Sequence, residues 1–189
     1  MFRQLAVALS LAATLILPAL AQDSASKDKS LDIRSSVGDL HVGPDADAKK
    51  IGVPLYPGAR PKSNDDNHDQ ANLSILTEEF GMNLLVASYV SNDTPAKIID
   101  FYRDKLKKFG KVLECYSQKH GAKIGTHDEE KDSSESKELK CDEDSGPVTE
   151  LKVGTEDNQH IVAVEPGDAS KGTSFALVYL RTRGKRGEI

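Results

Sequence analysis

The sequence predicts an α+β fold in which an antiparallel sheet of about five to seven strands packs on one main amphipathic helix. Two observations lead to this prediction. Short runs of alternating apolar and polar residues recur along the chain and are separated by turns that contain glycine or asparagine, as is typical of antiparallel strands. One segment, residues 95–109, instead places its apolar residues at the spacing of a single helix face.

The predicted helix has the clearest boundaries in the sequence. Asp93 or Thr94 can cap its free N–H groups, and Pro95 suits the first helical position. Gly110 can end it, because glycine readily adopts the backbone conformation that stops a helix. The apolar stripe consists of Ile98, Ile99, Tyr102, Leu106 and Phe109. A single stripe predicts that the helix covers one face of the sheet.

The strands are expected mainly in neighbouring pairs. A hairpin is predicted within residues 31–42, and two runs follow at 71–80 and 82–91. The run 82–91 is apolar on nearly both faces, which is typical of a central strand. Another hairpin is predicted within 149–165, and residues 175–180 form a final apolar strand.

Residues 1–21 are expected to be a signal peptide. Arg3 supplies a positive charge, and an apolar run of 13 residues follows. Bilayer-spanning helices need about 20 apolar residues, so this run is too short to serve as an anchor. A small-x-small sequence then predicts cleavage between Ala21 and Gln22. The predicted location is therefore periplasmic or secreted.

The mature chain is expected to form one domain with polar extensions. Residues 22–30 are polar and small and are predicted to be a disordered linker, and residues 31–182 form the single α+β domain. An acidic disordered loop is predicted within that domain at 118–138, and short β runs flank it at 112–116 and 139–141. A basic tail is predicted at 183–189.

Composition and charge exclude some classes of function. The net charge of the whole chain is −5, and removal of Arg3 with the leader makes it −6. Nucleic-acid-binding proteins present a clustered basic face, whereas the lysines here are scattered, so no nucleic-acid partner is expected. No second apolar run is long enough to span a membrane, and no cysteine follows Ala21. Neither a transmembrane anchor nor a lipid-modified N-terminal cysteine is expected.

Cys115 and Cys141 are the only two cysteines. In an oxidising compartment, two cysteines most simply form one disulfide. Two free thiols are the alternative interpretation. A thiol redox site is disfavoured because the C-x-x-C spacing is absent.

No catalytic, cofactor-binding or metal-binding motif is present in the sequence. The patterns H-E-x-x-H, G-x-S-x-G, G-x-G-x-x-G and G-x-x-x-x-G-K do not occur. No catalytic residue, cofactor or metal ligand is therefore assigned. His120 and His127 lie among acidic residues of the predicted loop, so weak divalent-cation binding by that loop is kept as an alternative.

Two tyrosines are candidates for contact with a ligand. Tyr56 precedes Pro57 and Gly58, which fit the centre of a type II turn, so a rigid turn would present its ring. Tyr102 lies on the apolar stripe of the predicted helix. Both rings could line a groove, and packing in the core explains them equally well.

Three short motifs occur in one part of the chain: the turn Tyr56-Pro57-Gly58-Ala59, the helix start Ser91-Asn92-Asp93-Thr94-Pro95, and the helix sequence Phe101-Tyr102-Arg103-x-x-Leu106. Together they resemble a loose group of exported bacterial proteins of unknown function. These match the group's "YPGA" turn and its "S-x-D-[ST]-P" and "FYR-x-x-L" patterns over roughly residues 31–113. The resemblance implies a strand and helix arrangement of this kind. It brings no catalytic residue with it.

The sequence therefore favours a soluble protein of the cell envelope that acts as a non-enzymatic binding or interaction domain. The expected partner is an envelope or extracellular protein or a small ligand. One alternative is a hydrolase-like enzyme whose site is assembled from residues far apart in the chain. The other alternative is weak cation binding by the acidic loop.

Overall fold

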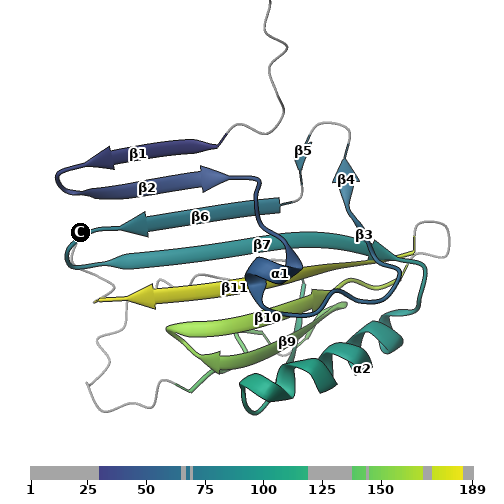
Figure 1. Ribbon diagram of the computed structural model, residues 1–189. Coiled ribbons are helices and arrows are strands. Elements are labelled where there is room, and N and C mark those ends of the chain that lie inside the picture. Colours follow the sequence, from purple (N-terminus) through teal and green to yellow (C-terminus); the bar gives the residue numbers. More distant parts are fainter. Residues whose placement is uncertain are drawn as a thin grey trace, which may run out of the picture.

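The computed structural model in Figure 1 describes residues 30–64, 67–68, 70–118, 138–143, 145–167 and 172–184. Several predictions fall elsewhere in the chain. The signal peptide, its cleavage between Ala21 and Gln22, and the linker up to residue 29 lie outside the described residues. So do residues 119–137 of the predicted acidic loop and residues 185–189 of the basic tail.

A sheet of nine antiparallel strands dominates the described part of the chain (Figure 1). Eight strands follow one another in the order β1, β2, β6, β7, β11, β10, β9, β8, and the short β3 pairs with β7. The strand bounds are β1 Leu31–Ser35, β2 Gly38–Gly43, β3 Arg60–Pro61, β6 Gln70–Leu76, β7 Gly81–Ser91, β8 Leu113–Ser117, β9 Val148–Thr155, β10 Asn158–Val164 and β11 Thr173–Arg183. A separate small hairpin is formed by β4 Ser63–Asn64 and β5 Asn67–His68.

The prediction of five to seven strands packed on one main helix is wrong. The sheet has nine strands and is the principal element, and the one substantial described helix contacts mainly β9 and β10. The N-terminal hairpin joins the sheet because β2 pairs with β6, from Asp39 with Leu76 to Gly43 with Asn72. Such long-range pairing leaves no signal in the local pattern. Residues 139–141 are not a strand, and the preceding residue, Glu138, forms an isolated bridge to Thr155.

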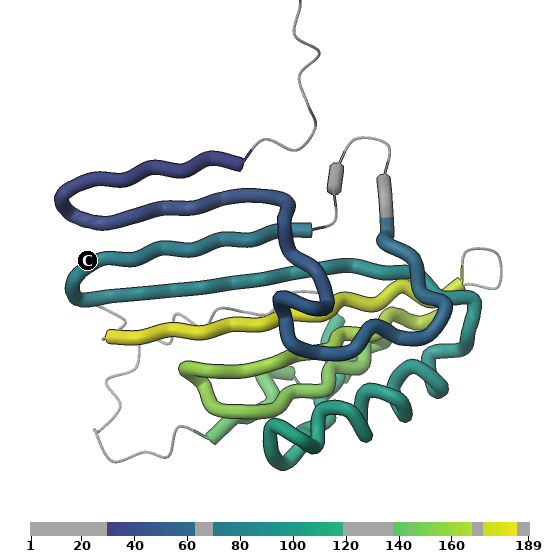
Figure 2. The backbone as a smooth tube through the Cα atoms, in the orientation of Figure 1, coloured from purple at the N-terminus to yellow at the C-terminus, as the bar shows by residue number. Residues whose placement is uncertain are grey.

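The sheet consists of two meanders that meet at its centre. Strands β1, β2, β6 and β7 form the first, and β8 to β11 form the second (Figure 2). The two meet where β7 pairs with β11 along the full 11 residues of each strand. All of these strand pairs are antiparallel. The pairs at the junction join residues that lie much farther apart in the chain than the pairs within either meander.

The helix α2, Pro95–Leu106, continues as a 3₁₀ turn, η1, Lys107–Phe109. Thr94 occupies the N-cap position with an extended backbone but makes no side-chain capping bond, and Pro95 begins the helix as predicted. The buried side chains Ile98, Tyr102 and Leu106 form its inner stripe. A short helix α1, Ala48–Ile51, follows β2 and was not predicted from the sequence.

The hydrophobic core lies between the sheet and these helices. One face of β7, β9, β10 and β11 packs against α2 and the α1 segment, and the side chains that share this core are Leu85, Ala87, Tyr89, Leu151, Val153, Val162, Val164, Phe175 and Leu177. Figure 1 shows that β1 and β2 extend beyond the part of the sheet that α1 and α2 cover. One half of the sheet therefore has a helical layer and the other half does not.

Candidate functional site

The two tyrosines that the sequence singled out lie in the core. Tyr102 is fully buried, and Tyr56 retains 8% of its surface exposed. The Tyr102 hydroxyl accepts a hydrogen bond from the backbone N–H of Tyr56 at 3.0 Å, and the Tyr56 hydroxyl donates to Asp93 at 2.9 Å. Their rings belong to an aromatic cluster with Phe101 and Phe175. Both side chains are engaged within the protein.

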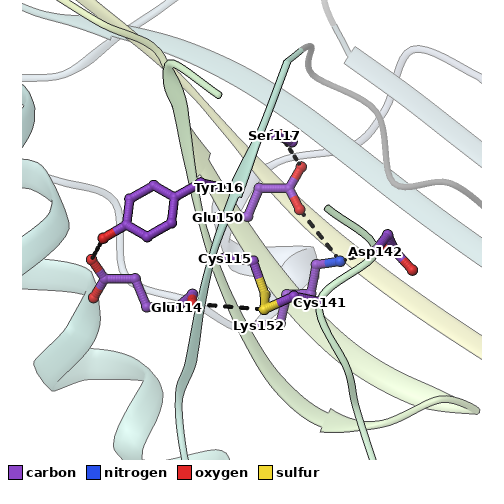
Figure 3. The surroundings of a disulfide bond; sticks show 8 residues. All are labelled: Glu114, Cys115, Tyr116, Ser117, Cys141, Asp142, Glu150 and Lys152. Atoms are coloured by element: carbon purple, nitrogen blue, oxygen red, sulfur yellow. Dashed lines mark hydrogen bonds and ion pairs between the residues drawn. A yellow bond between two sulfur atoms is a disulfide. The ribbon is translucent and has the colours of Figure 1, made fainter. Parts of the chain in front are cut away.

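Cys115 and Cys141 form a disulfide that ties β8 to the segment before β9. A buried charged cluster lies beside it (Figure 3). The Lys152 Nζ atom lies 2.6 Å from Asp142 and 3.3 Å from Glu150, and the Ser117 hydroxyl donates to Glu150 at 3.0 Å. The Lys152 and Glu150 side chains are 5% and 6% exposed. Their charges compensate each other in a site almost closed to water.

A second polar cluster connects β1, β2 and the turn before α1. His41 on β2 lies between two carboxylates, 2.7 Å from Asp32 and 3.3 Å from Asp45. The hydrogen bond to Asp32, and then the one to Asp45, raise the pKa of His41. Asp45 also binds Lys50 and accepts a hydrogen bond from the Asn72 amide at 3.0 Å, and these bonds, that of Lys50 foremost, lower its pKa. This cluster fixes the N-terminal hairpin to the body of the sheet.

The alternative function, weak cation binding, depends on a loop that contains His120 and His127. Both histidines lie outside the described residues. Within the described ranges, no group of three or more His, Cys, Asp or Glu side chains is arranged to hold a metal ion. His160, on β10, stacks on Phe109 with ring centroids 3.9 Å apart and contacts the Ile51 carbonyl at 3.0 Å. Burial lowers the pKa of His160, so the neutral imidazole is favoured in this packing role.

The feature that is not explained by packing is an apolar surface on the sheet face opposite the helices. Directly opposed residues in an antiparallel sheet share a face, and the register aligns two rows of them across β1, β2, β6 and β7. The first row is Ile33, Leu40, Ile75 and Met82, and the second is Leu31, Val42, Leu73 and Leu84. We call these eight residues the apolar face.

The apolar face becomes more exposed toward the edge of the sheet. On β11 its continuation is buried, with Leu180 opposite Leu84 only 2% exposed. At the other end Val42, Ile33 and Leu31 are 41%, 48% and 53% exposed. The intervening side chains are half-buried. The same two strands are polar on their other side, at Asp32 and His41. An exposed apolar surface of this kind is typical of a site that contacts another molecule.

The sequence carried part of this signal. The alternation Leu31-Asp32-Ile33 and Leu40-His41-Val42 predicts a hairpin with one apolar face. The apolar residues on both faces of β7 also indicate that both faces of this central strand are in contact with other apolar groups. Missing from the sequence was the pairing of β2 with β6, which aligns the two hairpins into a single surface.

No described helix is both long and apolar enough to cross a membrane. Comparison of the chain with protein-family models, with curated proteins and with solved structures finds no match. The functional conclusion therefore depends on the geometry of the chain itself.

Proposed function

We propose that this protein is an exported, non-enzymatic binding domain and that the apolar face is its interaction surface. The observation that carries the proposal is the continuous register of eight apolar side chains with three large exposed members, Leu31, Ile33 and Val42. A sheet face that only met water would alternate in polarity with the core face, as antiparallel strands with one solvated side do.

The energetics favour contact with another apolar surface. Full burial of a Val, Leu or Ile side chain contributes about 1.5–3 kcal/mol, and roughly half of this remains available at Leu31 and Ile33. Several such side chains in one plane add to a useful binding free energy without any directional bond. The geometry therefore suits a flat apolar partner, either a protein surface or a small apolar ligand.

The location outside the cytoplasm is part of the proposal. The disulfide between Cys115 and Cys141 closes a loop of 26 positions, and such structural disulfides persist in oxidising compartments. The leader predicted at residues 1–21 supports the same location. Mass spectrometry of the exported protein is expected to find Gln22 at its N-terminus, and retention of residues 1–21 would contradict this assignment.

A fluorescent apolar probe, 1-anilinonaphthalene-8-sulfonate, tests the interaction surface. The wild-type protein should bind it saturably, and the double substitution Val42→Thr/Leu73→Thr should weaken binding by roughly threefold or more, because each hydroxyl must be desolvated. Val37→Thr is the matched control, since the Val37 side chain is 77% exposed but lies in the turn between β1 and β2 and not on the apolar face. Equal loss in the control, or no probe binding by the wild type, would remove the proposal.

A further inference from the structure

The edge of the sheet at β1 has a sequence that is complementary to itself. β1 is the first strand in the sheet order, its only described partner is β2, and all five of its residues are exposed. An exposed edge strand can add a further strand through its main-chain N–H and C=O groups. We propose that β1 pairs antiparallel with β1 of a second copy of this chain, about a twofold axis at Ile33.

The register follows from the order of side chains. An axis at Ile33 places Ile33 opposite its own copy, Asp32 opposite Arg34 of the other copy, and Leu31 opposite Ser35. Shifting the axis by one residue in either direction places Asp32 opposite Asp32, or Arg34 opposite Arg34. Like charges directly opposite each other are destabilising, whereas opposite charges stabilise the pair. The intermediate registers would turn the apolar side chains to the wrong face.

The charges are available for this pairing. Within the described part of the chain, the Arg34 guanidinium has no ion-pair partner. The Asp32 carboxylate is held by His41 through its Oδ1 atom at 2.7 Å, and a carboxylate can accept further hydrogen bonds at its second oxygen. Twofold symmetry would form the Asp32–Arg34 pair twice, once on each side of the axis. Both pairs lie on the sheet face opposite Ile33, because side chains alternate along a strand.

The inference goes beyond the proposed function because it concerns the edge of the sheet. Pairing of β1 with its copy would join the sheets of the two molecules and make their apolar faces continuous across Ile33. A five-residue edge pair is short, and stable interfaces bury about 1,200–2,000 Å² in total. Self-association is therefore expected to be reversible and to depend on protein concentration.

Cysteine cross-linking tests the axis. In Ile33→Cys the two new sulfurs would face each other across the axis, with Cβ atoms about 4.5–5.5 Å apart, so mild oxidation should give a covalent dimer. Leu31→Cys is the matched control, since it lies on the same strand and face with similar exposure. Its copies would lie about 13 Å apart along the strands and should remain uncrosslinked. Equal cross-linking of both variants, or of neither, overturns the proposal.

Charge reversal tests self-complementarity. Arg34→Asp places two acidic residues on each β1, and Asp32→Arg places two basic residues there. Each variant alone should dimerise about tenfold more weakly than wild type in sedimentation velocity, because two pairs become repulsive. An equimolar mixture should restore association as a heterodimer, detectable when one variant carries a mass or fluorescent label.

The outcomes separate this inference from the proposed function. A wild-type protein that stays monomeric at all accessible concentrations, or a mixture that does not restore association, means that the edge charges only keep β1 apart from other chains, and the inference is wrong. The probe assay on Val42→Thr/Leu73→Thr is unaffected by that result, because neither residue lies on β1. Likewise, loss of probe binding in the Val37→Thr control leaves the cross-linking result intact.

Discussion

The hydroxyl of Tyr102 accepts a hydrogen bond from the backbone N–H of Tyr56, 46 positions earlier in the chain, at 3.0 Å. The bond fixes the turn at Tyr56 onto the buried side of α2. Burial raises the pKa of Tyr102 well above its ordinary value, so its hydroxyl stays protonated. A second buried tyrosine works in the same way, since the Tyr89 hydroxyl accepts from the Ala48 N–H at 3.0 Å. Two tyrosines thus hold the loop that carries α1 against the sheet.

Tyr102→Phe should therefore destabilise the protein although it keeps the ring. The Tyr56 N–H would lose its acceptor in a buried place, which costs about 1–3 kcal/mol. Urea unfolding measures the difference in the free energy of unfolding. Tyr116→Phe is the matched control, because Tyr116 is 44% exposed and its hydroxyl donates a hydrogen bond to the side chain of Glu114 and not to a buried group of the backbone. A loss in Tyr102→Phe no larger than in the control would show that the hydrogen bond contributes nothing.

The disulfide should contribute a large part of the stability. Loss of the Cys115–Cys141 bond frees a loop of 26 positions, for which the chain-entropy estimate is roughly 3.5 kcal/mol. The double substitution Cys115→Ala/Cys141→Ala is expected to lower the free energy of unfolding by about 2–4 kcal/mol in urea unfolding. Reductant should destabilise the wild type similarly and leave the double variant unchanged. A reduced wild type as stable as the oxidised one would contradict the prediction.

Glu150 and Lys152 should be strongly coupled. Lys152→Met leaves the buried Glu150 carboxylate without its cation and is expected to cost about 3–5 kcal/mol. The double variant Glu150→Gln/Lys152→Met should lose much less than the sum of its two single variants, because neither charge is then left alone. A double-mutant cycle from urea unfolding measures this coupling. Simple additivity of the two single effects would show that the buried ion pair has no net interaction.

The two described histidines of the sheet should titrate on opposite sides of the ordinary value of about 6.5. Burial lowers the pKa of His160, and the hydrogen bonds to Asp32 and Asp45 raise that of His41. Proton NMR of the imidazole resonances, assigned with the variants His41→Asn and His160→Asn, measures both midpoints. The reverse order would contradict the assignment of His160 as the buried imidazole.

These two shifts make the stability of the protein depend on pH in opposite directions. Below pH 6.5 the unfolded chain binds a proton at His160 before the folded protein does, so the stability that the neutral His160 contributes is lost as pH falls. The contribution of His41 is present below pH 6.5 and is lost as pH rises through its higher folded pKa. His41→Asn should therefore flatten the fall in stability above pH 6.5 in urea unfolding followed across pH, and an unchanged slope would argue against the His41 contacts.

The local elements of the fold could be predicted because their signals are local. Pro95 and Gly110 bound the helix, and the alternation near Leu31 and Leu40 locates the first hairpin. The strand number was wrong because it depends on which hairpins pair with one another. The four-residue α1 was missed, since it has one turn and is held by the Asp47 side chain, which accepts from the Lys50 N–H.

The candidate surface could be predicted only in part. An apolar face on the first hairpin is visible in the sequence, yet nothing local shows that Leu40 continues through Ile75 to Met82. The buried charges show the opposite difficulty. Glu150 and Lys152 alternate with Leu151, as residues on a solvated strand face would, but the structure buries both faces of β9. Glu150 contacts Ser117 of β8, and Lys152 contacts Asp142 next to the disulfide, and both contacts depend on tertiary structure that no local pattern shows.

The junction between β7 and β11 has a consequence for how the chain reaches its folded state. Each meander can form from its own hairpins soon after its residues are available. The pairing of β7 with β11 also requires Arg183, which pairs with Gly81. Contacts between residues about a hundred positions apart form slowly, because a long loop must be closed before they contribute. β11 is the last strand that the structure describes. In a chain that crosses a membrane N-terminus first, the β7 edge of the first meander would therefore lack its partner strand β11 until nearly the whole described domain has emerged.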